Sequence, residues 1–121
     1  MKNSILRDKA FSFAVKIVRV VQKVQQRHKE YILSGQLLDC GTSIGANERE
    51  AEYAQSRKDF INKLSVSLKE TNESQFFLEL LHATDYIETQ EYKTLYAESS
   101  EIKAILIASI RTAKAGISKR S

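Results

Sequence analysis

The sequence predicts an all-α fold, an antiparallel up-down four-helix bundle, on three observations. Its 121 residues include no proline and only four glycines, so long helices can run with few turns. Four stretches place apolar residues three or four positions apart, which is the spacing of an amphipathic helix. A chain of this length fits one domain, residues 1–121, and can bury about two thirds of its unfolded surface. We expect helices at about 4–27, 32–54, 57–83 and 92–115.

The first helix is expected to have an apolar side and a basic side. At 100° per residue its apolar residues share one side: Ala10, Phe13, Ala14, Ile17, Val18, Val21 and Val24. Its cations gather on the other side: Lys9, Lys16, Arg19, Lys23 and Arg27. A strand would scatter these cations over both faces, so their spacing favours a helix even in this valine-rich segment.

The second helix is expected to carry a heptad-like seam with one amide in it. The seam runs along residues at alternating steps of four and three: Leu33, Leu37, Cys40, Ile44, Asn47, Ala51 and Ala54. We interpret Asn47 as a structural residue that fixes register, with a ligand contact as the alternative. Gly41 and Gly45 lie on another side, where we expect close helix packing. A phosphate cradle would need a strand before the glycines and a lysine at fixed spacing.

The third helix is expected to begin after Ser56, whose hydroxyl can cap it, with Asp59 in the first turn. One apolar stripe runs along it: Phe60, Ile61, Leu64, Leu68, Thr71, Gln75 and Leu78. A second apolar face carries two acids: Val66, Glu70, Glu73, Phe76, Phe77 and Leu80. A bundle helix needs only one buried face, so the second face predicts an oligomer interface.

The fourth helix is expected from about Tyr92 to Ala115, after a loop over 84–91. Its inward residues follow helical spacing: Leu95, Ile102, Ile105, Leu106, Ile110 and Ala113. Gly116 is the expected stop of this helix.

Charge is divided unevenly along the chain, whose net charge is +4. Residues 1–33 hold eight Lys/Arg against two Asp/Glu, giving +6; residues 34–102 hold six against thirteen, giving −7; residues 103–121 hold five against none, giving +5. The C-terminal cations include Arg111, Lys114, Lys119 and Arg120. Since the first and last helices of such a bundle can be neighbours, we expect both basic segments to form one exterior patch that binds a polyanion. Ordinary solvation of exposed helix faces remains the alternative.

Little in the sequence indicates catalysis, a metal or a cofactor. The single cysteine, Cys40, cannot form an internal disulfide and suits a reducing cytoplasm. His28 and His82 are far apart, and Glu79 with His82 gives only half of a di-iron motif. No apolar run approaches a membrane span, and the N-terminus lacks the apolar core of a secretion signal. We expect a cytoplasmic, non-enzymatic protein with no metal, cofactor or membrane partner.

Five segments of the middle helices form a distinctive set: Tyr31-Ile32-Leu33-Ser34, Gln36-Leu37-Leu38, the run Gly41 to Asn47, Asp59-Phe60-Ile61, and Lys69-Glu70 with Glu73. With these segments the chain resembles the family of 23S rRNA intervening-sequence proteins, which also takes in accessory proteins of diversity-generating retroelements. The resemblance covers about two thirds of the chain. It implies a four-helix bundle assembled as a homopentameric barrel, and it includes the carboxylates Glu50, Glu70 and Glu73. It also implies a reverse transcriptase and template RNA as partners in the retroelement branch.

These observations predict an oligomeric protein that binds structured RNA or DNA without sequence preference. The site would comprise Lys9, Lys16, Arg19, Lys23, Arg27, Arg111, Lys114, Lys119 and Arg120. No aromatic interleaves with the cations and no recognition-helix motif appears, which argues against base-specific reading. The alternative is a protein-protein scaffold in which the basic residues only solvate the surface.

Overall fold

The computed structural model describes the backbone of residues 2–120 and the side chains of residues 5–116. These residues form four helices: α1 Lys2–His28, α2 Ile32–Glu52, α3 Arg57–Ala83 and α4 Thr89–Arg120. Each helix contacts the next along the chain, and α4 contacts α1, which closes the up-down bundle. The all-α four-helix prediction is confirmed.

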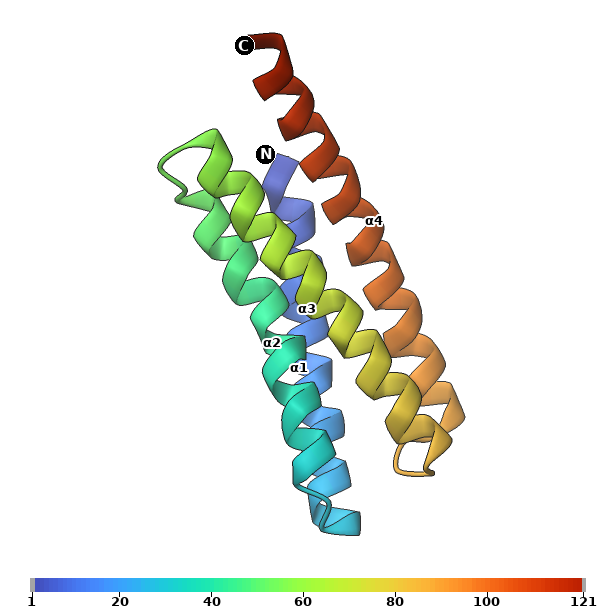
Figure 1. Ribbon diagram of the computed structural model, residues 1–121. Helices are drawn as coiled ribbons and strands as arrows, with labels where there is room; N and C mark the ends of the chain where they lie inside the picture. The colour runs from blue at the N-terminus through green and yellow to red at the C-terminus, as the bar shows by residue number, and fades with distance from the viewer. Residues whose placement is uncertain (1, 121) are drawn as a thin grey trace.

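Up-down topology gives the bundle two ends formed by different segments of the chain (Figure 1). One end, called the terminal end here, holds the start of α1, the turn between α2 and α3, and the last turns of α4. The opposite end, called the loop end, holds the α1–α2 and α3–α4 connections.

Two side chains cap the middle helices. Ser56 Oγ accepts a hydrogen bond from the backbone N–H of Asp59 at 3.0 Å, so the predicted start of α3 is confirmed. At the start of α2 the Glu30 carboxylate accepts backbone N–H bonds from residues 32, 33 and 34 at 2.8–3.1 Å. An acceptor at this place satisfies the free N–H groups of the first turn.

The predicted stop of the last helix at Gly116 is wrong, because α4 continues to Arg120. Gly116 does not adopt a positive φ, so it is not a left-handed helix stop. The Nη1 atom of Arg57 lies only 2.8 Å from the place that a Cβ on Gly116 would take. Glycine therefore admits the guanidinium at this point of α4.

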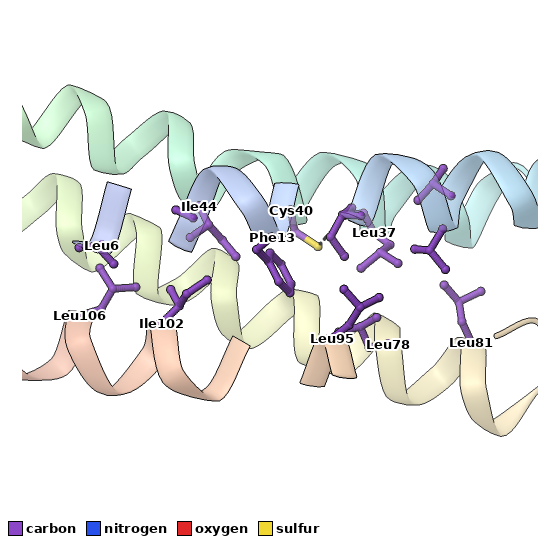
Figure 2. Close-up of a cluster of buried hydrophobic side chains, with 14 of the residues drawn as sticks. Leu6, Phe13, Leu37, Cys40, Ile44, Leu78, Leu81, Leu95, Ile102 and Leu106 are labelled. Carbon is purple, nitrogen blue, oxygen red and sulfur yellow. Dashed lines mark hydrogen bonds between the residues drawn. The ribbon is translucent and has the colours of Figure 1, made fainter. Parts of the chain in front are cut away.

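The core is a continuous apolar column along the bundle, to which all four helices contribute (Figure 2). Its fully buried side chains include Phe13, Ile17, Leu37, Ile44 and Leu78. On α1 the structure buries Val20 in place of Val18, which is half-buried with Ala14. Burying a side chain of this size contributes about 1.5–3 kcal/mol, so the column is the main source of stability.

A buried hydrogen bond sets the axial register of α2 against α3. Ser67 Oγ donates to the backbone oxygen of Ile44 at 2.8 Å, and one turn away Lys63 pairs with Glu50 at 3.2 Å. Residues 44 and 67 therefore lie at the same height on the bundle.

Candidate nucleic-acid interface

The basic side of α1 faces acids of α4, and the two sets meet in a ladder of ion pairs. Each predicted cation except Arg19 pairs with one carboxylate. The pairs are Lys9–Glu101 at 3.2 Å, Lys16–Glu98 at 2.5 Å, Lys23–Glu91 at 2.7 Å and Arg27–Glu88 at 4.0 Å. We call these four pairs the α1–α4 ladder. Its cations are already neutralised within the chain.

The α1 cations and the α4 cations lie at different heights, so the structure does not bring them together as one patch. The ladder acids run from Glu88, directly before α4, to Glu101 within it. Arg111 and Lys114 follow ten and thirteen residues after Glu101, which is about 15–20 Å further along the helix. Lys119 and Arg120 lie in the last turn of α4, and their side chains are outside the described residues.

The terminal end gathers cations that have no carboxylate partner among residues 5–116. These are Arg57 and Lys58 at the start of α3 and Arg111 and Lys114 on α4, and all four side chains are exposed. Arg57 reaches α4 at Gly116, so the two segments meet. We call these four residues the basic end.

Sequence reasoning missed Arg57 and Lys58 because they fall within the acidic middle segment. The topology of the predicted bundle could have indicated them. In an up-down bundle the turn between the second and third helices lies at the same end as both termini.

Three acids of the terminal end are paired or uncharged, whereas Asp8 and Asp59 have no cationic partner among the described side chains. Glu52 pairs with Arg7 at 3.5 Å, and Glu50 pairs with Lys63. Glu48 is only 2% exposed; burial first, and then the neighbouring Glu52 carboxyl, raises its pKa to about 8. Glu48 is therefore mainly protonated at neutral pH. Glu48 Oε1 and Glu52 Oε2 have no hydrogen-bond partner in the part of the chain whose side chains are described.

The four predicted structural residues of α2 occupy different environments. Gly41 is buried against α1, where an added Cβ would lie 2.9 Å from Ile17. Gly45 lies near Ala10 with more room. Asn47 is half-buried, and its amide donates to the Ser43 backbone oxygen of its own helix at 2.9 Å. Glu48, the residue after Asn47, is buried although it is not part of the predicted seam, and Glu50 is exposed.

Most of the second face of α3 lies outside the core, as its spacing indicates, but Phe77 packs against the core. Phe76 is 58% exposed, and the other five residues are half-buried: Val66, Glu70, Glu73, Phe77 and Leu80. Phe76 and Phe77 meet edge to face, with ring centroids 5.2 Å apart. Burial is the first cause that raises the pKa of Glu70, followed by the nearby charge of Glu73.

The side chains that could take part in catalysis or bind a metal, two histidines and one cysteine, pack against aromatic and apolar neighbours. His82 stacks on Tyr92 at 4.3 Å, and its Nε2 lies 3.0 Å from Thr89 Oγ1. His28 meets the edge of Tyr86. Burial raises the pKa of the Cys40 thiol, which keeps it protonated. Across the described residues, no three His, Cys, Asp or Glu side chains gather closely enough to hold a metal ion, and no helix is apolar enough over a sufficient length to cross a membrane.

Comparison with known proteins places this chain in one family. Residues 2–108 match the family described as 23S rRNA-intervening sequence protein. The chain is also similar to a protein of unknown function from Bacteroides thetaiotaomicron VPI-5482, described as a member of the S23 ribosomal protein family and solved at 1.70 Å. That crystal structure has 49% sequence identity and a TM-score of 0.89, and the match covers 92% of this chain and 99% of that one. No curated protein matches. Because the family match spans nearly the whole bundle, the chain belongs to the 23S rRNA-intervening sequence protein family.

Proposed function

We propose that this protein is a cytoplasmic, non-enzymatic nucleic-acid-binding protein that acts as a homo-oligomer, with a pentamer as the expected assembly. The terminal end, and not the basic side of α1, would contact the sugar-phosphate backbone of RNA or DNA. The family description supports RNA as the polyanion. The resemblance to retroelement accessory proteins adds a reverse transcriptase as a candidate protein partner, which co-purification would test.

The observation that carries this proposal is the contrast between paired and unpaired cations. A cation that already pairs with a carboxylate must give up that pair before it binds a phosphate, and the net gain is small. Arg57, Lys58, Arg111 and Lys114 give up no such pair. Each phosphate that they neutralise releases counterions, so binding should weaken steeply with salt. An oligomer multiplies these contacts through its copies.

Salt-titrated binding of a variant in which all four residues of the basic end become glutamine tests the proposal. We expect the parent protein to bind duplex RNA and duplex DNA with a steep salt dependence. The variant should lose on the order of 100-fold in affinity near 0.1 M salt, and its slope of log affinity against log salt should flatten by several units. Fluorescence anisotropy with labelled duplexes of mixed sequence measures both quantities.

A matched control neutralises unpaired, exposed cations at the loop end, Lys29→Gln with Lys93→Gln. This control should change affinity by less than about threefold, because it lowers the net charge without touching the proposed site. The control removes two charges and the variant four, so losses of log affinity in that proportion would show a general charge effect and contradict the assignment of the site. No binding by the intact parent oligomer at low salt would contradict nucleic-acid binding itself.

The α1–α4 ladder favours a second candidate, a protein-protein scaffold. If cations and anions of this chain chiefly neutralise one another, the partner surface is the apolar face of α3. The same titration separates the two candidates, since a scaffold would assemble and yet leave the anisotropy of labelled duplexes unchanged.

A further inference from the structure

The turn between α2 and α3 lies at the terminal end (Figure 1) and carries an exposed tyrosine. Tyr53 is 85% exposed, which is more than any other large apolar side chain among residues 5–116. Its ring takes part in none of the aromatic or cation–π contacts of those residues. Single exposed apolar side chains are common on protein surfaces, so the surroundings of the ring decide what it can bind.

The backbone holds Tyr53 in a fixed place. Tyr53 is the C-cap residue of α2, and its N–H donates to the backbone oxygen of Glu50 at 3.2 Å. Only two residues separate it from Ser56, whose hydroxyl caps α3 by accepting from the N–H of Asp59. A short turn that is anchored on both sides loses little conformational freedom when its side chain binds a ligand. The backbone under the ring is therefore preformed.

An open groove of about 450 Å³ borders the ring, between the end of α2 and the start of α3. It is lined by Arg49, Glu50, Tyr53, Gln55, Asp59 and Lys63. We call it the turn groove. Its volume is in the range that proteins use to bind small organic groups. The groove can therefore take a single planar group that approaches from solvent, but not a double helix.

The polar groups of the turn groove suit the edge of a nucleobase better than a phosphate. Lys63 is paired with Glu50 at 3.2 Å, so that cation is already neutralised. The Gln55 amide and the Asp59 carboxylate have no partner among the side chains that the structure describes. An amide donates and accepts, a carboxylate accepts, and such groups read the hydrogen-bonding edges of unstacked bases. A phosphate in the groove would instead be repelled by Asp59.

The basic end begins directly after the turn, where it can hold the phosphates next to such a base. Arg57 and Lys58 follow Tyr53 by four and five residues, beyond the capping Ser56. The sequence shows no aromatic among the cations that were predicted to bind, but these two cations, which have no carboxylate partner among residues 5–116, are close neighbours of Tyr53. Bases inside a duplex stack on one another and cannot reach the ring, whereas an unpaired base can.

We propose that the turn groove binds an unpaired nucleobase of single-stranded RNA or DNA. The base stacks on Tyr53, Gln55 and Asp59 contact its edge, and Arg57 and Lys58 hold the adjacent phosphates. Stacking on an aromatic ring tolerates every base, because each base has a π face. This inference rests on the proposed nucleic-acid binding and names what the terminal end recognises, which is a single-stranded end, loop or bulge beside a duplex.

A pair of matched probes tests the preference for unpaired bases. A duplex with a short single-stranded overhang is compared with a blunt duplex of equal phosphate number, once as RNA and once as DNA. We expect the parent to bind the overhang probe about tenfold more tightly, which is the effect of stacking about one base. A preference seen with only one of the two nucleic acids would assign the groove to that sugar. Equal affinity for overhang and blunt probes in both would overturn the proposal.

Tyrosine variants locate the preference. Tyr53→Leu should bind overhang and blunt probes alike and keep its affinity for the blunt duplex within about twofold, whereas Tyr53→Phe should keep the tenfold preference. Tyr31→Leu is the matched control, because Tyr31 is an exposed tyrosine at the other end of α2, and it should also keep the preference. Unchanged melting by circular dichroism shows that each variant folds. A Tyr53→Leu protein that keeps the preference would overturn the proposal.

Photocrosslinking of the parent protein tests the contact without any substitution. An overhang that carries 5-iodouracil at an unpaired position should crosslink to Tyr53 on irradiation, and mass spectrometry of the digested product identifies the residue. Crosslinks confined to residues outside the turn groove would overturn the proposal. The blunt duplex keeps the two levels of inference apart: blunt binding without a preference for the overhang contradicts the turn groove alone, whereas no binding of any probe contradicts the proposed function as well.

Discussion

The two ends of the bundle use their cations differently. At the loop end Lys23 and Arg27 meet Glu91 and Glu88, and a glutamate caps α2. At the terminal end Arg57 and Arg111 have no carboxylate partner among the described side chains, and an acid, Glu48, is buried in its neutral form. The ion pairs and the cap of the loop end favour the folded state, although Lys29 and Lys93 have no described partner there, whereas the clustered cations and the buried acid of the terminal end oppose folding. Such local conflicts are expected where a surface serves binding.

This difference teaches that counting cations does not locate available charge. Exposed ion pairs contribute little stability each, about 0–1 kcal/mol, yet they remove the field that a polyanion would sense. Lys16 and Arg57 are both exposed cations, but only Arg57 projects an uncompensated charge.

The largest stability effect should come from reversing two central pairs of the ladder. Lys16→Glu with Lys23→Glu places carboxylates against Glu98 and Glu91, which should lower the free energy of unfolding by roughly 2 kcal/mol at low salt. The loss should shrink by about half in 0.5 M salt, because screening weakens repulsion between exposed charges. Urea unfolding followed by circular dichroism measures both values.

Arg19→Glu is the matched control, since Arg19 is an exposed cation of the same helix side without a partner among the described carboxylates. It should change stability by less than about 0.5 kcal/mol. Equal losses for Arg19→Glu and for the double reversal would mean that the ladder adds nothing beyond net charge, and the contrast between the two ends would fail.

Helical periodicity was enough to predict most of the fold. It located the four helices and most inward residues, because a 3.6-residue repeat marks the buried side of each helix. The errors concern where a helix ends and which of two nearby residues points inward. Val20 and Glu48 are buried where the pattern predicted Val18 and Asn47. Two consecutive residues at the edge of an apolar stripe are only 100° apart around the helix axis. A small change in how the helix packs can therefore decide which of the two is buried.

The site could not be predicted to the same degree, because its pairing depends on rotation and axial register between helices. Glu91 and Glu98 belong to the acidic middle segment of the sequence, and nothing local shows that they face Lys23 and Lys16. The segment boundaries also separated Arg57 from Arg111, which the topology brings to one end. The charge of a segment can be counted in the sequence, whereas the number of cations that have no ion-pair partner depends on the tertiary structure.

A smaller effect, of opposite sign, is expected at the terminal end from Glu48→Gln. Folded Glu48 keeps its proton up to about pH 8, whereas the unfolded chain releases it near the ordinary value of 4.5. The folded state therefore binds more protons between these values, and stability falls as pH rises through that window. Glutamine removes this loss, so the variant should be more stable than the parent at pH 8 and nearly equal to it at pH 4.5, with the difference growing as pH rises between these values.

Glu50→Gln provides the control, because Glu50 is an exposed acid two residues away. Its effect should stay below about 0.5 kcal/mol at both pH values. A Glu48→Gln protein that is less stable than the parent at pH 8 would mean that the folded protein stabilises Glu48 as a charged group. The buried acid of the terminal end would then not destabilise the fold.

The smallest expected effect concerns Glu30 at the loop end, and its pH dependence should run the other way. Burial works to raise the pKa of Glu30, but hydrogen bonds from the backbone of Leu33, Ser34 and Ile32 outweigh it, so the pKa is lowered. A lowered folded pKa means that the cap stabilises the protein above about pH 4.5 and is lost as pH falls through the folded value. Glu30→Ala should lower the free energy of unfolding by about 1 kcal/mol at pH 7 and by much less near pH 3.

Urea unfolding at both pH values measures this change, with Glu79→Ala as the control, because Glu79 is an exposed acid of α3 near the same end with no ion pair or capping contact among the described side chains. The result bears on the comparison because Glu48 and Glu30 are the same residue type in opposite settings. One acid is buried without enough donors and weakens the fold as pH rises, whereas the other receives three backbone donors and strengthens it. If the effects of Glu30→Ala and Glu48→Gln on the free energy of unfolding changed with pH in the same direction, the two ends would not differ in how they stabilise a carboxylate.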